Sequence, residues 1–587
     1  MVDPDYTAVS RQDPDSGDFP SSFVRENKDG KASALFPRSY VMRRRLSFAA
    51  VLGLFIAAAT FATLELGRRR GHLMGSQEQA GSERSLAIAT WNMAAINNNP
   101  FEYWITYDED PRYEELMVAV EKFLEEPGDR DLSVEEVFGQ KRFKKLKEKM
   151  EKVGWADVTD YWDSELKDRK IVSEFLKDPL LGSKRLVSMP DRVTNTINVV
   201  DSDIPACRPT VINMYSKDLS DLDKWFERWM NFMFKDTLKI PISETETQKS
   251  IPYEMLQPIS KAKYPDITED EEVRSLPLQT LCGAIFDCIL VHMMNTLEDP
   301  SVWQGLKKTM VENLNKQKIP HTVEILQRSY QSSDIIALQE VSSSFVLTAQ
   351  QHFENHFHVV PPNEIDATRD QNSILLLSKA RFPDGPTSEI TQLVHESFPP
   401  DVKVPVATGD ILCITATDFY GDNYVIASFH GDTNGLATIP VVNAILQTMS
   451  SKPDLADHKL IFGLDANTYE HGEAGKKQDV LEFADYYVTQ GLTSCWGDKP
   501  NPRNYTTFNA RTYLQPQLNK ACKSTEKREK GDVNPKDFIL FAKDQFDVLQ
   551  TLKDNTGEKS YIEDMAFPTL NFPSDHGILS TVLEPKN

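Results

Sequence analysis

The segment Lys459–Asn467 places an aspartate and an asparagine directly after an apolar run. Every residue of Leu460–Leu464 is apolar except one glycine, which is typical of a buried strand. Side chains two positions apart on a strand point the same way, so Asp465 and Asn467 can reach into one cleft. There the carboxylate can deprotonate water while the amide holds that carboxylate or an anionic oxygen. A plain turn would favour the same two residue types.

Four further apolar stretches are flanked by a polar side chain that can bind a metal or transfer a proton. One ends in an asparagine, one in a glutamate and one in a histidine, and the last follows a Ser-Asp-His triplet. They are Ala87–Asn92, Asp334–Glu340, Tyr424–His430 and Ser574–His576 with the apolar residues 577–583 behind it. One such coincidence is common, but five in one chain predict strands whose ends meet at a functional cleft.

These motifs, in this order, resemble the endonuclease/exonuclease/phosphatase superfamily of metal-dependent phosphoesterases. The resemblance is carried by Trp91-Asn92, Gln339-Glu340-Val341, Asn372, His430, Asp465-Ala466-Asn467, Asp537-Phe538-Ile539-Leu540 and Ser574-Asp575-His576. It covers 85–96 and 320–587 and implies an α/β fold, a four-layer sandwich of two packed mixed sheets flanked by helices. One departure is that the family usually has glycine directly before the aspartate of Asp-x-Asn, whereas Leu464 stands there in this chain.

Within this resemblance, Glu340 is expected to bind a divalent cation, with an oxygen of Asn92 beside it and Asp575 as a third ligand. Mg²⁺ binds few protein carboxylates and keeps several waters, which suits such a set. We therefore expect Mg²⁺ as the cofactor, with Mn²⁺ as the alternative ion. Asn372 matches a family position that lines the substrate cleft, although a turn would also favour asparagine.

The resemblance also implies the catalytic roles. Asp465 would act as general base or orient the attacking water, and Asn467 would hold the attacking oxygen or a phosphoryl oxygen. His576 would contact or protonate the phosphate, oriented by Asp537, since a carboxylate partner favours the charged form of histidine. His430 would face His576 as a donor or acid. Each residue alone has a structural explanation at a strand end, turn or cap, but their joint order favours catalysis.

An uncharged stretch near the N-terminus predicts a membrane anchor. Residues 46–64 carry no charge, and arginine triplets stand on both sides, Arg43–Arg45 and Arg68–Arg70. A helix rising ~1.5 Å per residue over such a length spans the ~30 Å hydrocarbon layer. We expect a single transmembrane signal anchor at 46–66.

The segments on either side of the anchor predict its orientation. A disordered tail is expected at 1–45 and a polar stalk at 67–84. More positive charges precede the span than follow it, which favours a cytoplasmic N-terminus and a catalytic domain in a lumen or outside the cell. The glycosylation sequon Asn504-Tyr505-Thr506 agrees with this orientation.

The chain between Asn92 and Glu340 is much longer than a strand–helix–strand connection requires. We therefore expect a mainly helical insertion at 97–319 within a catalytic domain of 85–587. Apolar residues have helical spacing at 114–125, 135–152, 219–234, 276–297 and 302–315. The segment 281–290 is apolar on all sides except for Asp287, which favours a buried helix over a second membrane span.

The remaining segments complete the predicted domain. Phe101, Tyr103 and Trp104 can either line a substrate pocket or anchor the insertion by packing. Helices are expected at 321–332 and 438–450, and strands at 373–378, 410–417, 423–429, 537–541 and 545–550. Residues 499–536 are expected to form a loop whose charged run, 523–532, is solvated.

Charge and composition limit the substrate. The net charge of −23 opposes a broad nucleic-acid-binding surface, which needs a basic stripe. No Cys-x-x-Cys pair occurs, so a zinc framework is not expected. The favoured function is a membrane-anchored phosphoesterase acting on a lipid head group or small phosphoester. The alternatives are a nuclease acting on DNA or RNA and a catalytically silent protein that binds a partner through the insertion.

Overall fold

The computed structural model describes residues 82–586, apart from 96, 188–193, 203, 242–245, 367–368, 402 and 516–530. The predicted tail at 1–45, the signal anchor at 46–66 and most of the stalk at 67–84 lie outside the described residues. Residues 85–587 belong to one compact unit.

Six strands form the first sheet, in the order β15-β16-β1-β6-β8-β7. They are β1 (Leu86–Asn92), β6 (Ile335–Val341), β7 (Phe357–Val360), β8 (Asn372–Ser378), β15 (Phe546–Asp554) and β16 (Ile578–Pro585). Only β1 and β6 run parallel. The central strands β1, β6 and β8 are buried along nearly their whole length, as their continuous apolar runs predict for strands covered on both faces.

The second sheet also has six strands, in the order β13-β14-β12-β11-β10-β9. They are β9 (Pro386–Glu389), β10 (Ile411–Thr417), β11 (Asn423–His430), β12 (Lys459–Asp465), β13 (Leu492–Ser494) and β14 (Asp537–Ala542). Here β11 and β12 are the parallel pair. The two sheets are therefore both mixed, as expected.

The two sheets share an apolar core, to which Ile88 of the first sheet and Ile426 of the second belong. The sheets approach each other closely at Gly463 of β12, where an added Cβ atom would lie 2.6 Å from Cβ of Ala337. Any larger side chain at position 463 would force the sheets apart. This glycine therefore sets the spacing of the sheets two residues before Asp465.

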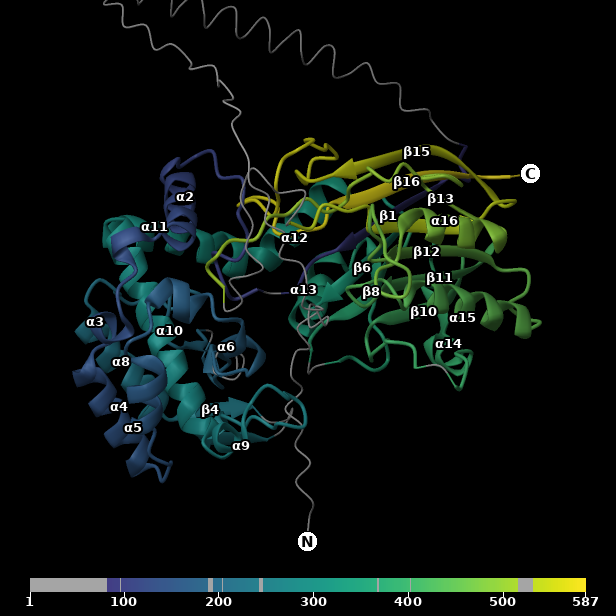
Figure 1. Cartoon of the computed structure of the whole chain (residues 1–587). Coiled ribbons are helices and arrows are strands. Elements are labelled where there is room, and N and C mark those ends of the chain that lie inside the picture. The colour runs from purple at the N-terminus through teal and green to yellow at the C-terminus, as the bar shows by residue number, and fades with distance from the viewer. Residues whose placement is uncertain are drawn as a thin grey trace, which may run out of the picture. The chain divides into compact units, whose positions relative to one another are not determined.

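Helices cover the outer face of each sheet (Figure 1). The helices α12 (Lys318–Ser329) and α13 (Ser343–Phe353) share a core with β1, β6 and β8 of the first sheet. The helices α14 (Thr391–Glu396), α15 (Thr438–Ser451) and α16 (Val480–Thr489) share another with the second sheet. The order is helix, sheet, sheet, helix, so the predicted α/β class is confirmed.

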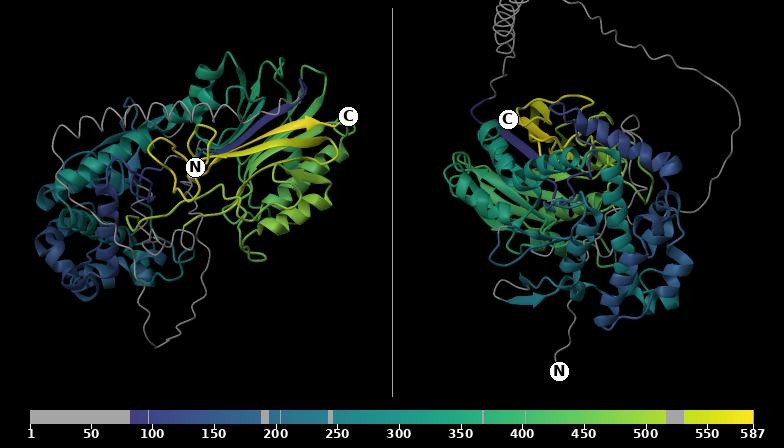
Figure 2. Two further views of the ribbon diagram at one scale, coloured as in Figure 1. Left: turned by 90° about the horizontal axis from the view of Figure 1, so that it is seen from above. Right: turned by 90° about the vertical axis from the view of Figure 1, so that its left-hand side faces the viewer.

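The chain between β1 and β6 builds a separate, mainly helical region with its own core (Figures 1 and 2). Its helices are α2 (Arg112–Glu125), α3 (Val134–Val137), α4 (Gln140–Lys152), α5 (Thr159–Tyr161), α6 (Pro179–Ser183), α8 (Leu222–Phe234), α9 (Glu269–Val273), α10 (Ser275–Leu297) and α11 (Pro300–Val311). Short helical turns lie at 128–130, 162–166, 171–176, 252–255 and 312–316. Two small hairpins complete it, β2 (Thr196–Ile197) with β3 (Ala206–Cys207), and β4 (Leu238–Pro241) with β5 (Thr247–Ser250).

The helix α10 is the buried centre of this region. Among the described residues it is the one helix long and apolar enough to cross a membrane, yet 89% of its most apolar window is buried inside the protein. Nearly every residue from Ser275 to Met294 is buried. The prediction of a buried helix at 281–290 is confirmed.

The predicted helix at 135–152 is wrong in one respect, because the structure divides it into α3 and α4. Gly139, between them, has φ 81° and ψ 148°, a conformation that breaks a helix and that only glycine adopts at little cost. The end of α3 is packed in the core through Val137 and Phe138. The apolar spacing continues across the break, so periodicity alone could not reveal it.

Asp287, the one charge in the apolar stretch of α10, is fully buried and paired with Arg208. The Arg208 Nε atom lies 2.8 Å from Oδ2 of Asp287, and the indole N–H of Trp229 donates to the same oxygen at 2.8 Å. Arg208 has only 2% of its side chain exposed. Removing one partner of such a pair leaves an uncompensated charge in the core.

We therefore expect Asp287→Leu to lower the free energy of unfolding by about 3–5 kcal/mol. The double variant Arg208→Met/Asp287→Leu should lose much less, because no buried charge remains. Urea denaturation of both variants measures the difference. A single variant as stable as the double variant would contradict this account of the pair.

Candidate active site

Polar side chains from both sheets meet at one end of the sandwich. The parallel pairs β1/β6 and β11/β12 bring their carboxyl ends together within each sheet. The antiparallel strands β14 and β16 begin at those ends. Six of the predicted site residues stand at these strand ends: Asn92, Glu340, His430, Asp465, Asp537 and His576.

The side chain of Asn92 connects the two sheets. Its fully buried Nδ2 donates to Oε1 of Glu340 at 3.0 Å and to Oδ2 of Asp465 at 2.9 Å. Its Oδ1 accepts a hydrogen bond from the backbone N–H of Ala94 at 2.9 Å. A single amide nitrogen thus satisfies one carboxylate from each sheet.

Glu340 reaches this cluster because β6 is irregular near its end. The pairing of β6 with β8 shifts register at this point, and Glu340 has a left-handed backbone with φ 54°. The neighbouring Gln339 side chain lies between the sheets, donating to the hydroxyls of Thr90 at 3.1 Å and Ser428 at 3.0 Å. Bulges of this kind commonly redirect a side chain beside a functional site.

The surroundings of Glu340 keep its carboxylate ionised. Its Oε2 accepts from the backbone N–H of Ala95 at 2.7 Å, and its Oε1 lies 3.3 Å from Nε2 of His430. Burial opposes the charge, but the attraction of His430 and the hydrogen bonds from Asn92 and Ala95 lower the pKa of Glu340 to about 2. Glu340 therefore carries its negative charge at neutral pH.

His576 forms a buried pair with Asp537, as predicted. Nδ1 of His576 lies 3.0 Å from Oδ2 of Asp537, and Nε2 lies 3.7 Å from Oδ2 of Asp465. Burial alone would lower the pKa of His576, but the two carboxylates raise it to about 10. The imidazole is therefore charged at neutral pH and can only donate hydrogen bonds.

The Asp465–Asn467 turn is tightly constrained. Asn467 has φ 48°, and its backbone N–H donates to Oδ1 of Asp465 at 2.9 Å. At Gly435, an added Cβ atom would lie 2.6 Å from the carbonyl oxygen of Asn467. Leu464, which departs from the family pattern, lies in the core between the second sheet and its helices. The substitution thus changes the packing on the outer face and leaves Asp465 in the cluster.

Lys536 is a site residue that the sequence did not reveal. Its Nζ donates to Oδ1 of Asn467 at 2.9 Å and lies 2.7 Å from Oδ2 of Asp532. Asp532, expected at the end of a solvated charged run, has only 30% of its side chain exposed. The one available signal was the position of Lys536, directly before Asp537 at the start of a buried strand.

Asp575, predicted as a third metal ligand, is bound to other partners. Its Oδ2 accepts a hydrogen bond from the hydroxyl of Tyr103 at 3.0 Å, and the Nδ2 of Asn509 lies 3.5 Å away. Its contacts thus come from the segment after β1 and from the loop before β14. Its role as a ligand stays a prediction.

Asn372 uses its whole carboxamide to hold its own loop. Its Oδ1 accepts from the backbone N–H of Asp366 at 2.8 Å, and its Nδ2 donates to the carbonyl oxygens of Val341 at 3.2 Å and Asp366 at 3.3 Å. The side chain is 1% exposed. These contacts within the protein are enough to explain why asparagine stands at this position. The substrate-binding role of Asn372 stays a prediction.

The segments around the insertion add two side chains to the site. Phe101 and Trp104 pack in the core of the helical region, as the packing expectation has it, whereas the hydroxyl of Tyr103 donates to Asp575. A substrate-lining role for this group stays a prediction. At the start of α12, the buried Lys318 donates to the carbonyl oxygen of Pro573 at 3.2 Å. Burial lowers the pKa of Lys318 to about 8 against the pull of the Asp575 and Glu340 carboxylates.

Two groups of side chains offer ligand atoms for a cation. Asp465, Asp537 and His576 are buried, and their ligand atoms lie within 4.8 Å of one another. Nδ1 of His576 is already bound to Oδ2 of Asp537 at 3.0 Å, so only its Nε2 is left to face a cation in this group. Glu340 offers an ionised oxygen, the ligand type that Mg²⁺ prefers, and so fits a hard divalent cation.

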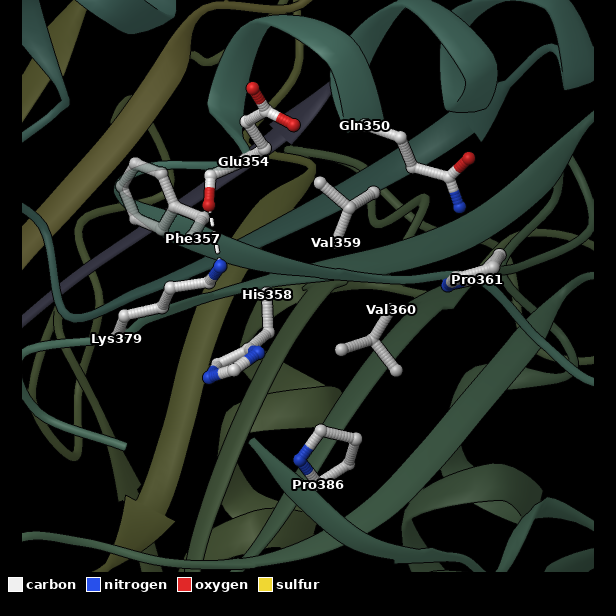
Figure 3. A pocket seen from close by; sticks show the side chains of 9 residues that line it. All are labelled: Gln350, Glu354, Phe357, His358, Val359, Val360, Pro361, Lys379 and Pro386. Carbon is white, nitrogen blue, oxygen red and sulfur yellow. Dashed lines mark hydrogen bonds between the residues drawn. The ribbon is translucent and has the colours of Figure 1, made fainter. Parts of the chain in front are cut away.

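A separate groove of about 440 Å³ lies at the edge of the first sheet (Figure 3). It is lined by residues of β7, by the end of α13 and by Lys379, whose ammonium group donates to the carbonyl oxygen of Glu354. None of the predicted site residues lines it. The groove is therefore distinct from the strand-end cluster.

The helical region matches a known sequence family of unestablished function. Residues 131–308 match the domain of unknown function DUF8234. No curated protein matches the chain.

Several solved structures are similar to about half of the chain. The human Nocturnin catalytic domain with bound sulfate is 17% identical, with 47% of this chain and 89% of that chain covered, at a TM-score of 0.32. An endonuclease/exonuclease/phosphatase family protein from Bacteroides thetaiotaomicron is 14% identical, with 46% and 89% covered, at 0.29. ANGEL2, described as a 2',3'-cyclic phosphatase, is 14% identical, with 46% and 85% covered, at 0.31.

The pair of His576 and Asp537 makes a direct prediction about proton binding. In Asp537→Asn the imidazolium loses a negative partner, so the pKa of His576 should fall well below its native value of about 10. Histidine NMR signals followed against pH measure this shift. The signal of the exposed His471 serves as the internal reference in both proteins. An unchanged His576 pKa would show that Asp537 does not hold its proton.

Proposed function

We propose that this protein is a divalent-metal-dependent phosphoesterase that hydrolyses phosphodiesters or phosphomonoesters. The observation that carries the proposal is the hydrogen-bonded cluster of Asn92, Glu340 and Asp465 beside the pair of His576 and Asp537. These residues come from strands far apart in the sequence and from both sheets. Their order and chemistry also match the family that the sequence resembles.

The cluster can supply what phosphoester hydrolysis needs, namely an oriented water, stabilised phosphoryl charge and a proton for the leaving oxygen. In the proposed mechanism, Asp465 orients and deprotonates the water. The amide of Asn467 and the charged imidazole of His576 donate to phosphoryl oxygens. His430, 3.8 Å from Asp465 and 3.3 Å from Glu340, donates to the leaving oxygen.

Glu340 would hold the divalent ion, with Asn92 and Asp575 as the further proposed ligands. We propose Mg²⁺, with Mn²⁺ as the alternative. A bound ion neutralises phosphoryl charge and polarises the phosphorus–oxygen bonds. The ionised carboxylate of Glu340 is the feature that supports this role.

We propose a lipid head group or another small phosphoester as the substrate. The lysines found at the site, Lys318 and Lys536, are at most 6% exposed, so they offer no basic surface along which a long polyanionic strand could bind. The net charge of −23 also opposes binding along nucleic acid.

Residues 46–66 would tether this enzyme to a membrane, with the catalytic domain in a lumen or outside the cell. The support is the uncharged sequence between two arginine triplets. The sequon at Asn504 adds little, because Thr506 has a structural reason to be threonine. Its Oγ1 accepts hydrogen bonds from the backbone N–H groups of Lys536 and Asp537, both at 3.0 Å.

The full chain in detergent should hydrolyse a generic phosphodiester or phosphomonoester in the presence of Mg²⁺. Asp465→Ala and His576→Ala should each lower kcat/KM by at least about 10³-fold, because each removes a group that acts on the reacting atoms. Product release measures this, with anionic lipid vesicles, small phosphoesters and single-stranded oligonucleotides compared as substrates. Faster cleavage of oligonucleotides would favour the nuclease.

Two exposed residues give matched controls for these variants. His471→Ala and Asp547→Ala remove the same side-chain types from exposed positions, with 91% and 68% of the side chain exposed, and should leave the rate unchanged. Activity that survives a chelator, or that survives both Asp465→Ala and His576→Ala, would overturn the proposed mechanism.

The proposed topology makes a separate prediction. In sealed membrane vesicles that retain cellular orientation, the described residues 82–586 should resist an added protease until detergent is present. Replacing 46–66 by a polar linker should release the chain from the membrane. Cleavage of the catalytic domain in intact vesicles would place that domain on the cytoplasmic side instead.

A further inference from the structure

Lys536 is almost fully buried beside the proposed catalytic turn. Its side chain is 3% exposed, and its ammonium group has three neighbours. Nζ donates to Oδ1 of Asn467 at 2.9 Å, lies 2.7 Å from Oδ2 of Asp532, and stands 5.3 Å from the centre of the Tyr469 ring. A buried ammonium group is costly unless it is paired in this way.

The contact with Lys536 fixes the orientation of the Asn467 carboxamide, with its oxygen toward the ammonium group. An ammonium group has only donors, so it can bind the amide oxygen and not the amide nitrogen. Nδ2 of Asn467 therefore points the other way, where it donates to the carbonyl oxygen of Gly431 at 3.4 Å. That hydrogen bond is long, and the second N–H of Nδ2 has no acceptor among the described residues.

The backbone reinforces this orientation. Asn467 has a left-handed conformation, and its backbone N–H is tied to Asp465. The turn itself is thus fixed by the backbone, and the remaining freedom is rotation of the terminal amide. Lys536 removes that freedom, so an N–H donor is held in place beside Asp465.

We propose that Lys536 is a positioning residue that orients the Asn467 amide so that its N–H group donates to a phosphoryl oxygen. The inference rests on the proposed function of the site and deepens it. Lys536 acts through Asn467 and touches no reacting atom. Its ammonium group also adds a buried positive charge behind the position of an anionic substrate.

A purely structural role for Lys536 makes a different prediction. In that case the ammonium group would serve only to hold Asp532 and the loop before β14. Asp532, however, has other partners, since its Oδ1 accepts from Nδ2 of Asn534 at 2.7 Å and its backbone pairs with Asn509. If the role were purely structural, removing Lys536 would lower the stability of the protein by the same amount with or without the Asn467 side chain.

A double-mutant cycle with Lys536→Met and Asn467→Ala separates the two roles, because residues that act as a unit are not additive. We expect each single variant to lower kcat/KM by ~100-fold, the lower end of the loss when one donor to a developing oxyanion is removed. The double variant should be no more than ~3-fold worse than Asn467→Ala alone. Losses that multiply in the double variant would overturn the proposal.

Binding of inorganic phosphate, measured by calorimetry on the full chain in detergent, gives a readout independent of turnover. Lys536→Met should weaken binding by ~10-fold in the native background and not in the Asn467→Ala background. If native protein binds phosphate with this coupling but hydrolyses nothing, the proposed hydrolysis fails, while the orientation of Asn467 by Lys536 for phosphate binding stands. Native protein that binds no phosphate overturns both.

Two further variants guard against loss of fold. Lys536→Met/Asp532→Asn removes both charges, so no uncompensated carboxylate remains, and it should show the same dependence on Asn467. Lys307→Met is the matched control, since Lys307 is also 3% exposed but lies in the helical region, donating to the carbonyl oxygen of Thr210. It should keep kcat/KM within ~2-fold. If Lys307→Met lowered kcat/KM as much as Lys536→Met, the loss would come from removing any buried lysine and not from releasing the Asn467 amide.

Discussion

The carboxamide of Asn92 is the contact on which the site depends, because its nitrogen donates to a carboxylate from each sheet. These hydrogen bonds require the two sheets to be close together at the end where Glu340 and Asp465 lie. Gly463 provides that spacing, since no side chain larger than hydrogen fits against Ala337. The close packing of the two sheets is therefore also the condition for assembling the site. A substitution that pushes the sheets apart would separate Glu340 from Asp465 even with every site residue intact.

Segments outside the sandwich complete the charge balance of the site. Tyr103 enters from the start of the helical region, Lys318 from α12, and Lys536 from the loop before β14. Buried carboxylates are costly unless they are paired, and these residues supply donors and positive charge beside Asp575, Glu340 and Asp465. The helical region thus contacts the strand-end cluster directly, through the hydrogen bond from Tyr103 to Asp575.

The strand ends were predictable because long apolar runs stop abruptly at polar residues, as at Asn92, His430 and Asp465. Strand alternation then gives the direction of the side chains, and the family resemblance gives the pairing of Asp537 with His576. The bulge that redirects Glu340 was not predictable, since it depends on pairing between β6 and β8. The contacts of Lys536 and Lys318 were not predictable either, because the spacing of apolar residues in their segments does not indicate tertiary contacts. Gly139 breaks a helix whose apolar periodicity continues across it, so only its conformation shows the break.

The central claim is that side chains from both sheets act around one cation and one phosphate. Crystals of the full chain grown with Mn²⁺ and inorganic phosphate would test it through the anomalous scattering of manganese. The account predicts a manganese peak at the carboxylate of Glu340 and a phosphate between the amide of Asn467 and the imidazole of His576. Manganese bound away from Glu340, with no phosphate touching Asn467 or His576, would contradict it.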